Sequence, residues 1–202
     1  MRFPNPNQTI LFDRTQIELE CFLLFCVVVA GKKASVQVEL LRLFLDGNSC
    51  PFEYIRELDS LGTLNQKLKE SRLGQYTKTT VCFKALAYSD LDLFTCTIDD
   101  LENIYGIGPK TARFFISCTR RNARHAVIDT HLLKYMAQYL GWKVPIATLS
   151  SKSAYKQIEN DWLSHVDNLN VNPAELDLAI WKIYANRDDS DYKKLVANSS
   201  IA

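Results

Sequence analysis

The stretch LENIYGIGPKTARFFISCTRRNARHAVIDTHLLKYM, residues 101–136, decides the fold and bears on function. It contains a Gly-Ile-Gly turn at positions 106–108, followed at once by Pro109 and Lys110. Asp129 lies nineteen positions after this lysine. Proline favours the first turn of a helix and aspartate favours the N-cap, so both charged residues stand where a helix is expected to begin. The stretch therefore predicts two helix starts, each carrying a reactive side chain.

Helical periodicity dominates the rest of the chain, which predicts an all-α fold. The apolar run CFLLFCVVVA, residues 21–30, is read as a buried core helix, because crossing a bilayer takes about 20 apolar residues. The polar residues 188–202 are expected to form a loose tail. The predicted helices cover residues 15–30, 35–45, 51–61, 64–70, 78–88, 97–104, 109–119, 130–140, 153–166 and 173–184.

Length and composition favour one compact domain, or two small lobes within it. The chain has 202 residues, of which 47% are hydrophobic, and its net charge is +1. This excludes a disordered or strongly basic protein, but not DNA binding, which depends on local charge. Residues 105–134 carry +5 and residues 159–191 carry −6. These clusters are either a local positive field beside an acidic one or two ordinary solvated faces.

The cysteines argue against a metal site. None of the six belongs to a C-x-x-C pair, and none lies in the last 84 residues. No signal peptide is visible, so reduced thiols and a cytoplasmic or nucleoid-associated location are expected. We expect neither a metal nor a cofactor.

The turn and its flanking helices, residues 98–119, predict a helix-hairpin-helix that grips DNA. Glycines permit backbone angles that a Cβ forbids, and they let a phosphate approach the main chain. Free N–H groups and the dipole at the start of the second helix favour an anion there. The alternative is a plain helical hairpin with a glycine C-cap. The expected DNA contacts here are Gly106, Gly108, Thr111 and Arg113.

Lys110 and Asp129 are the candidate catalytic pair. A cation is disfavoured at the positive end of a helix, which favours a neutral amine that can attack an electrophilic carbon. The alternative for Lys110 is a phosphate contact, and the alternative for Asp129 is a simple N-cap. Residues 113–128 are one helix and a short return loop, a path that can bring Asp129 back beside Lys110.

These motifs resemble the helix-hairpin-helix (HhH-GPD) DNA glycosylase superfamily. The matching residues are Gly106-Ile107-Gly108-Pro109-Lys110 and Val127-Ile128-Asp129-Thr130-His131, within the central third of the chain. The resemblance implies a two-lobed helical fold with a DNA cleft between the lobes. One lobe would hold the hairpin, at about residues 31–120, and the other would combine residues 1–30 with 121–187. It also implies that a lysine at this position marks enzymes that both remove the base and cleave the strand.

The resemblance further implies a mechanism on double-stranded DNA containing a damaged base. The nucleotide is flipped out of the duplex, the Lys110 amine attacks C1′ and the base leaves. Asp129 assists deprotonation and stabilises the positive charge on the sugar. The resulting Schiff base permits β-elimination. A monomer is expected.

The substrate is inferred from differences within the family. A branch similar to endonuclease III carries four cysteines after the catalytic aspartate, and this chain has none there. Its short length resembles the compact archaeal and bacterial 8-oxoguanine glycosylases. In the archaeal forms an aspartate and a tryptophan four residues apart contact the oxidised purine, and Asp177 and Trp181 match that spacing. The alternative is a core tryptophan with a surface aspartate.

Two further positions complete the expected site. Phe114 stands where the larger eukaryotic-type enzyme has a cysteine against the base, and it either stacks on a purine or belongs to the core. Lys32 or Lys33 either fills the gap left by the flipped base or contacts phosphate.

The sequence thus predicts a base-excision-repair glycosylase with AP lyase activity, acting on an oxidised purine such as 8-oxoguanine. One alternative is the same chemistry on an oxidised pyrimidine or another lesion. The other is a non-catalytic DNA-binding protein that retains the hairpin.

Overall fold

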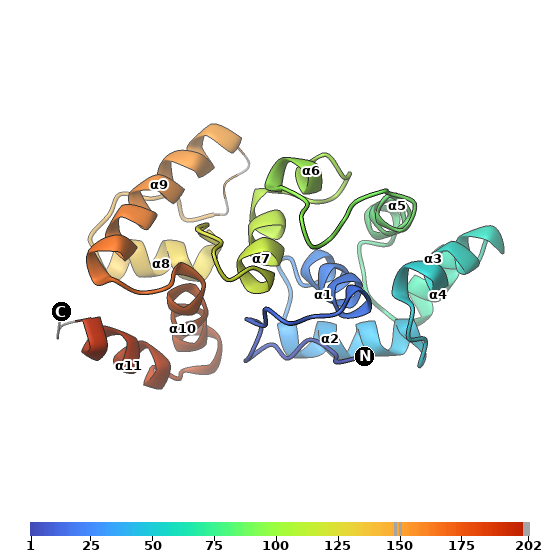
Figure 1. The fold of residues 1–202 in the computed structure, drawn as a ribbon, viewed down its shortest axis with the longest axis horizontal. Coiled ribbons are helices and arrows are strands. Elements are labelled where there is room, and N and C mark those ends of the chain that lie inside the picture. The colour runs from blue at the N-terminus through green and yellow to red at the C-terminus, as the bar shows by residue number, and fades with distance from the viewer. Residues whose placement is uncertain (148, 150, 200–202) are drawn as a thin grey trace.

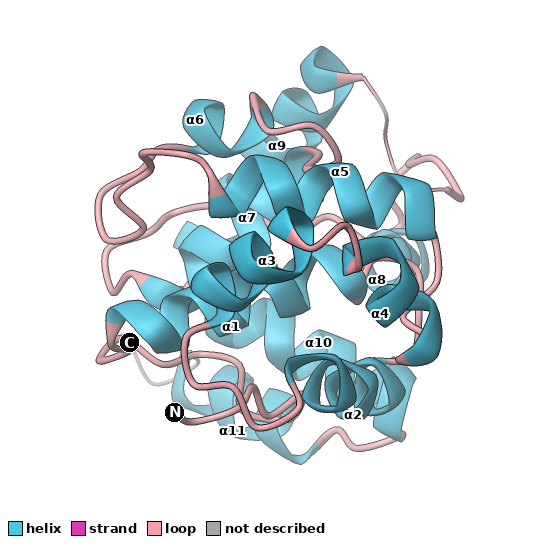
Figure 2. Cartoon of the chain, turned by 90° about the vertical axis from the view of Figure 1, so that its right-hand side faces the viewer, coloured by secondary structure: helices cyan, strands magenta, loops and turns pink. Residues whose placement is uncertain are grey.

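The chain folds into helices joined by turns and short loops (Figure 2). The structure is a computed structural model that describes residues 1–147, 149 and 151–199. Within these residues it contains eleven α-helices and no strand, which confirms the all-α expectation. The helices are α1 (Gln16–Val28), α2 (Ala34–Leu45), α3 (Pro51–Ser60), α4 (Leu64–Glu70), α5 (Tyr76–Ala87), α6 (Ile98–Glu102), α7 (Pro109–Thr119), α8 (Thr130–Tyr139), α9 (Lys152–Leu169), α10 (Pro173–Asn186) and α11 (Ser190–Ser199).

Local capping signals fix several helix starts. α1 follows Thr15, whose hydroxyl accepts from the backbone N–H of Glu18, while the Glu18 carboxylate accepts from the N–H of Thr15. The same reciprocal pair joins Thr97 and Asp100 at the start of α6, which confirms the predicted N-cap. α7 has the predicted bounds. These signals act within one turn of the helix, so the sequence alone suffices to locate them.

α1 is the central helix of the first half of the chain. Its residues 21–26 are buried, and it contacts α2, α3, α5 and α7 (Figure 1). The Phe22 ring packs against two rings of α7, with centroid distances of 5.6 Å to Phe114 and 6.1 Å to Phe115. Burying a large apolar side chain stabilises the fold by about 1.5–3 kcal/mol. The predicted core helix is confirmed.

Buried apolar side chains form two clusters. The first runs from Leu19 to Cys118 and unites α1–α7, and the second runs from Ala126 to Ile180 and unites α8–α10. In Figure 1 these groups of helices occupy opposite halves of the molecule. The expected division placed residues 1–30 with the C-terminal half. The structure differs because α1 packs at the centre of the first cluster.

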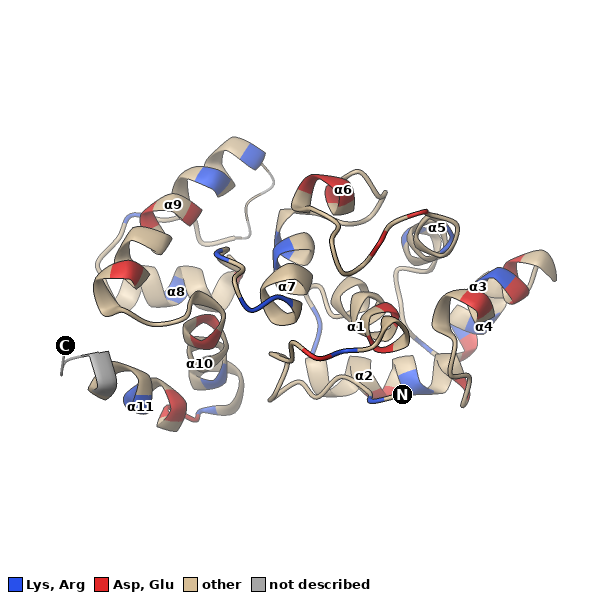
Figure 3. Ribbon diagram, viewed as in Figure 1, with Lys and Arg blue, Asp and Glu red and all other residues tan. Residues whose placement is uncertain are grey.

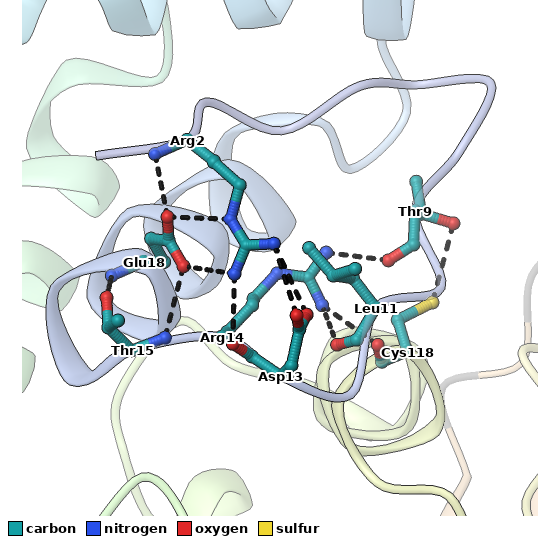
Figure 4. Close-up of polar contacts among 8 residues, drawn as sticks. All are labelled: Arg2, Thr9, Leu11, Asp13, Arg14, Thr15, Glu18 and Cys118. Atoms are coloured by element: carbon teal, nitrogen blue, oxygen red, sulfur yellow. Dashed lines mark hydrogen bonds and ion pairs between the residues drawn. The ribbon is translucent and has the colours of Figure 1, made fainter.

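The N-terminal segment, residues 1–14, is held against the end of α7 (Figure 4). Its anchor is the buried side chain of Arg14. The guanidinium donates to the carbonyl oxygens of Thr9 (2.7 Å), Leu11 (2.6 Å) and Cys118 (2.9 Å). A cation is favoured at the negative end of a helix dipole, which suits its contact with the last turn of α7.

The C-terminal region is more ordered than the predicted loose tail over residues 188–202. α11 occupies most of it and contacts α10. The hydroxyl of Tyr192 lies 2.7 Å from that of Tyr135 on α8, and Lys182 pairs with Asp191 at 2.5 Å. The prediction is wrong because the contact of Tyr192 with Tyr135 joins residues 57 positions apart, which a local pattern does not show. The last three residues are outside the described part.

All six cysteines are free thiols. Five are buried, and Cys50, which precedes α3, is half-buried. Burial raises the pKa of both Cys21 and Cys82 to about 12. Among the helices described, none combines the length and the apolar character needed to cross a membrane.

Candidate active site

A cavity of about 460 Å³ lies where helices of the two clusters meet. Its walls come from the N-terminal segment, α1, the turn before α2, α7, the start of α8 and α10. Most of the predicted site residues line it, namely Lys32, Lys33, Lys110, Thr111, Phe114, Asp129, Asp177 and Trp181. Gly106, Gly108 and Arg113 are not part of this lining.

Lys110 and Asp129 meet in the cavity. The lysine lies in the first turn of α7 and the aspartate precedes α8. The Lys110 Nζ atom is 3.7 Å from Asp129 Oδ2, and the side chains are 27% and 15% exposed. This distance indicates an ion pair rather than a direct hydrogen bond. The arrangement joins an amine and a carboxylate that can exchange a proton next to a bound molecule.

Asp129 is also the N-cap of α8. Its Oδ1 accepts from the backbone N–H groups of His131 (2.8 Å) and Leu132 (2.9 Å). The capping alternative is therefore correct, but it occupies only one carboxylate oxygen. The other oxygen faces Lys110, so capping fixes the orientation of the pair instead of competing with it.

The two glycines of the turn between α6 and α7 have different surroundings. Gly106 has φ +97°, and a Cβ there would lie 3.0 Å from the Cβ of Cys82. Gly108 is the N-cap of α7, and a Cβ there would meet no atom within 4 Å. Ile107 between them is buried in the first cluster. Gly106 is therefore required by local packing, whereas Gly108 faces open space in which a phosphate contact stays a prediction.

The other predicted DNA contacts differ in accessibility. Thr111 is buried and faces the cavity. The Nζ atom of Lys32 donates to the Leu73 carbonyl oxygen at 2.5 Å, and burial, with a smaller effect of nearby Lys78, lowers the pKa of Lys32. Lys33 is exposed at the N-cap of α2. Of the two lysines, Lys33 is the one whose position suits a phosphate contact.

Arg113 does not fit the predicted phosphate contact. Its side chain is only 11% exposed and pairs with Glu159 at 2.8 Å and Glu102 at 2.9 Å. Its guanidinium also lies 4.5 Å from the ring centroid of Tyr155. Two carboxylates inside the protein hold this cation, so it is a structural link between α6, α7 and α9.

Asp177 and Trp181 lie on α10, one turn apart, and both face the cavity. Asp177 Oδ2 accepts from the backbone N–H of Val127 at 2.8 Å, while its Oδ1 is buried. Burial raises the pKa of Asp177 to about 8. The aspartate is therefore not the surface residue of the alternative interpretation.

Phe114 fits both interpretations proposed for it. Its ring packs against Phe22 and Phe25 of α1, with centroid distances of 5.6 Å and 6.4 Å. It also forms part of the cavity wall. A base in the cavity could therefore contact a ring that the core already holds in place.

Sequence reasoning missed Tyr155 and Glu159. They lie on the buried face of α9 with Trp162 and Val166. Burial alone would raise the pKa of Glu159, but hydrogen bonds and charges from His125, Arg113 and the backbone lower it to about 2. A glutamate at a core position of an amphipathic helix is the signal that marks this residue.

The N-terminal segment was not predicted to take part in the site either. Pro6 and Thr9 line the cavity. Asn7 accepts a hydrogen bond from Asn186 at the end of α10, at 2.8 Å. The segment thus spans the two halves and forms one wall.

His131 also lines the cavity and stacks on Tyr184 with a centroid distance of 5.7 Å, which agrees with a structural role.

The positive and negative stretches of the sequence partly neutralise each other. Lys and Arg residues lie along α7 and the loop that follows it, and acidic residues lie on α9 and α10 (Figure 3). Arg113 pairs with Glu159, and Arg124 pairs with Asp167. The positive field around α7 is therefore weaker than the count of charges implies. Among the described residues, no three His, Cys, Asp or Glu side chains group as metal ligands.

Comparison with known proteins gives one relevant similarity. No family model and no solved structure matches the chain. The chain is 28% identical over 171 residues to an "8-oxoguanine DNA glycosylase/AP lyase" of Thermoplasma acidophilum, an alignment that covers 79% of this chain and 76% of that protein. This similarity supports a glycosylase-like relationship and agrees with the all-helical architecture described above.

Proposed function

We propose that this protein is a DNA glycosylase with AP lyase activity that removes an oxidised purine, 8-oxoguanine above all, from double-stranded DNA. The observation that carries the proposal is the approach of Lys110 Nζ to within 3.7 Å of Asp129 Oδ2, at the wall of a cavity of about 460 Å³. Pockets for small molecules span roughly 300–1,000 Å³, so this one has room for a flipped base. The similarity to a protein with this activity supports the same conclusion.

In the proposed reaction, Lys110 is the nucleophile. Asp129 takes a proton from the paired Lys110 ammonium, and the neutral amine attacks C1′ of the flipped nucleotide as the bond from C1′ to the base breaks. The departing base takes up the proton that Asp129 holds. Asp129 then accepts the proton released by the amine and stabilises the positive charge that develops on the sugar. The sugar ring opens to a Schiff base with Lys110. Loss of a proton from C2′ then breaks the bond between C3′ and its phosphate oxygen, which is the β-elimination step.

The lining of the cavity supports a planar aromatic substrate. Trp181 and Phe114 supply aromatic surfaces, and Asp177 supplies a polar group between α10 and the loop before α8. Aromatic and apolar side chains that enclose a flipped base, with a few polar groups to read its edge, are typical of enzymes that act on extruded nucleotides.

Borohydride trapping tests the proposed nucleophile. Borohydride reduces a Schiff base, so the wild-type protein and lesion-containing DNA should give a covalent adduct, and the Lys110→Gln variant should give none. Lys134→Gln is the matched control, because Lys134 is exposed on α8 and is not part of the cavity lining. An adduct that persists in Lys110→Gln would place the nucleophile elsewhere, whether or not Lys134→Gln forms one.

A set of duplexes that each contain one lesion tests the substrate. We expect excision of 8-oxoguanine to be faster than excision of any oxidised pyrimidine. The opposite order would assign the same chemistry to the alternative substrate class. DNA binding without excision or adduct formation on any duplex would instead favour the non-catalytic alternative.

A further inference from the structure

The backbone that leads to Asp129 is held by side chains rather than by secondary structure. Residues 126–128 form no helix or strand, yet Ala126 and Ile128 are fully buried. Buried N–H groups need acceptors, and each of the three finds one on α9 or α10. The acceptors are Glu159 Oε1 for Ala126 (3.0 Å), Asp177 Oδ2 for Val127 (2.8 Å) and the Tyr155 hydroxyl for Ile128 (2.8 Å).

These three acceptors, Tyr155, Glu159 and Asp177, are called the anchor residues below. The Tyr155 hydroxyl also donates to the carbonyl oxygen of Ala126 at 2.8 Å. The Tyr155 hydroxyl therefore makes two hydrogen bonds to the same stretch of backbone, one as acceptor and one as donor. Residues 126–128 lead directly into Asp129, so the position of their backbone determines the position of the Asp129 carboxylate.

The same network reaches the helix that carries the lysine. Both carboxylate oxygens of Glu159 share the single N–H of Arg113 Nε, at 2.8 Å and 2.9 Å. Arg113 lies on α7, three residues after Lys110. One carboxylate therefore contacts both the chain before Asp129 and the helix of Lys110.

The anchor residues lie on α9 and α10, two helices of the second cluster, whereas Lys110 lies on α7, a helix of the first. Without a link, the distance between Lys110 and Asp129 would vary with any movement between the two halves. The Arg113 side chain bonds to Glu102 as well, at 2.9 Å, so the link is fixed at both ends.

We propose that Tyr155, Glu159 and Asp177 are positioning residues that hold Asp129 at its working distance from Lys110. The inference rests on the proposed function. It adds a group of residues whose effect on the reaction is exerted through the backbone of residues 126–128. Misplacing a reacting group by about 1 Å can lower a rate by about a hundredfold, so loss of an anchor should slow the chemical step.

The test uses Tyr155→Phe, which removes the hydroxyl and keeps the ring against Arg113. Its matched control is Tyr192→Phe, because the Tyr192 hydroxyl also makes a hydrogen bond to a side chain of the second cluster, but away from residues 126–128. Single-turnover excision, affinity for lesion-containing DNA and Tm are measured for both variants. We expect the Tyr155→Phe rate to fall about tenfold to a hundredfold with unchanged affinity, and the Tyr192→Phe rate to match the wild type.

A purely structural role predicts a different result. If both variants lose the same Tm and the same rate, or if Tyr155→Phe keeps the wild-type rate, the inference is overturned. A second comparison guards against poor folding of Tyr155→Phe. Glu159→Gln keeps an acceptor for the N–H of Ala126 and Glu159→Ala does not. Single-turnover excision by Glu159→Ala should therefore be at least about tenfold slower than excision by Glu159→Gln. Equal rates in these two variants would also overturn the inference.

The controls separate this inference from the proposed function. A wild-type protein that neither excises a lesion nor forms an adduct would overturn both. An active wild-type protein with an equally active Tyr155→Phe variant would overturn the inference alone.

Discussion

Asp129 combines a helix cap with the role proposed for it in the reaction. One oxygen caps α8 through two backbone N–H groups, and the other lies 3.7 Å from Lys110. A capping side chain has little rotational freedom, so its second oxygen is held where the amine can use it. The conformational entropy of the carboxylate is thus lost when the helix forms, and not when the substrate binds.

The substitution Asp129→Asn separates these two roles. An asparagine oxygen can still cap α8, because asparagine and aspartate are about equally good N-caps. In the proposed reaction the Asp129 charge assists proton transfer, so its loss should lower single-turnover excision by at least about a hundredfold. Affinity for DNA and Tm should remain close to the wild type. Unchanged turnover would reduce Asp129 to a cap.

Trp181 provides a second test at the scale of a single residue. Stacking of a base on an aromatic ring contributes about 1–3 kcal/mol, so Trp181→Ala should excise 8-oxoguanine roughly fivefold to a hundredfold more slowly. DNA with an abasic site has no base to stack, so borohydride trapping on that DNA should be unaffected. Normal excision by Trp181→Ala would contradict a base-binding role.

At the scale of elements, the sequence predicts where helices lie better than it predicts which helices and side chains pack together. α6 and α7 were predicted because Thr97, Pro109 and the glycine turn act within one turn of a helix. α11 was missed because Tyr192 depends on Tyr135, 57 residues away. Arg113 was placed on a DNA-facing surface for the same reason, since its partners Glu102 and Glu159 are not neighbours in the sequence.

The turn between α6 and α7 allows a matched pair of substitutions. Gly106→Ala forces a Cβ into a left-handed backbone and to within 3.0 Å of Cys82 Cβ, so the free energy of unfolding should fall by at least about 1–2 kcal/mol. Gly108→Ala meets no neighbour within 4 Å and should affect stability less. If a phosphate approaches this turn, Gly108→Ala should weaken DNA binding instead. Chemical denaturation and a binding titration measure the two effects.

Equal loss of stability in the two variants would contradict the packing role given to Gly106. Unchanged DNA affinity in Gly108→Ala would remove the support for a phosphate at the start of α7. The hairpin would then be a structural connection between α6 and α7.

At the scale of the whole molecule, the site depends on the contact between two halves. The sequence identified Lys110 and Asp129 from local motifs, and the structure brings them together in one cavity. The halves themselves were divided incorrectly, because the sequence carries no local mark of which cluster α1 joins. The N-terminal segment was overlooked because its place in the cavity wall depends on Arg14 and a carbonyl group of α7, 104 residues away.

Asp177 makes the stability of the molecule depend on pH. Burial raises its pKa from 3.8 to about 8, so between these values the folded protein holds a proton that the unfolded chain has lost. The free energy of unfolding therefore falls as pH rises through this window. Asp177→Asn lacks this titration. Its stability relative to the wild type should increase from the acidic to the alkaline end by at least about 1.4 kcal/mol, the value of one pKa unit.

Denaturant titrations of both proteins at the two ends of the window provide the measurement. Glu159 acts in the opposite direction, because its pKa is lowered from 4.5 to about 2 and its contribution is lost only as the solution becomes strongly acidic. The pH range in which stability changes therefore distinguishes the Asp177 carboxyl from the Glu159 carboxyl. A stability difference that does not change with pH would mean that Asp177 is ionised in the folded protein throughout the window.

The burial of five of the six thiols has a practical consequence. Maleimide reagents attack the thiolate, which a raised pKa and a closed interior both suppress. Cys50, before α3, is the remaining candidate for brief labelling of the folded chain. A fluorophore attached there, outside the cavity lining, would report tumbling and complex formation in an unmutated background.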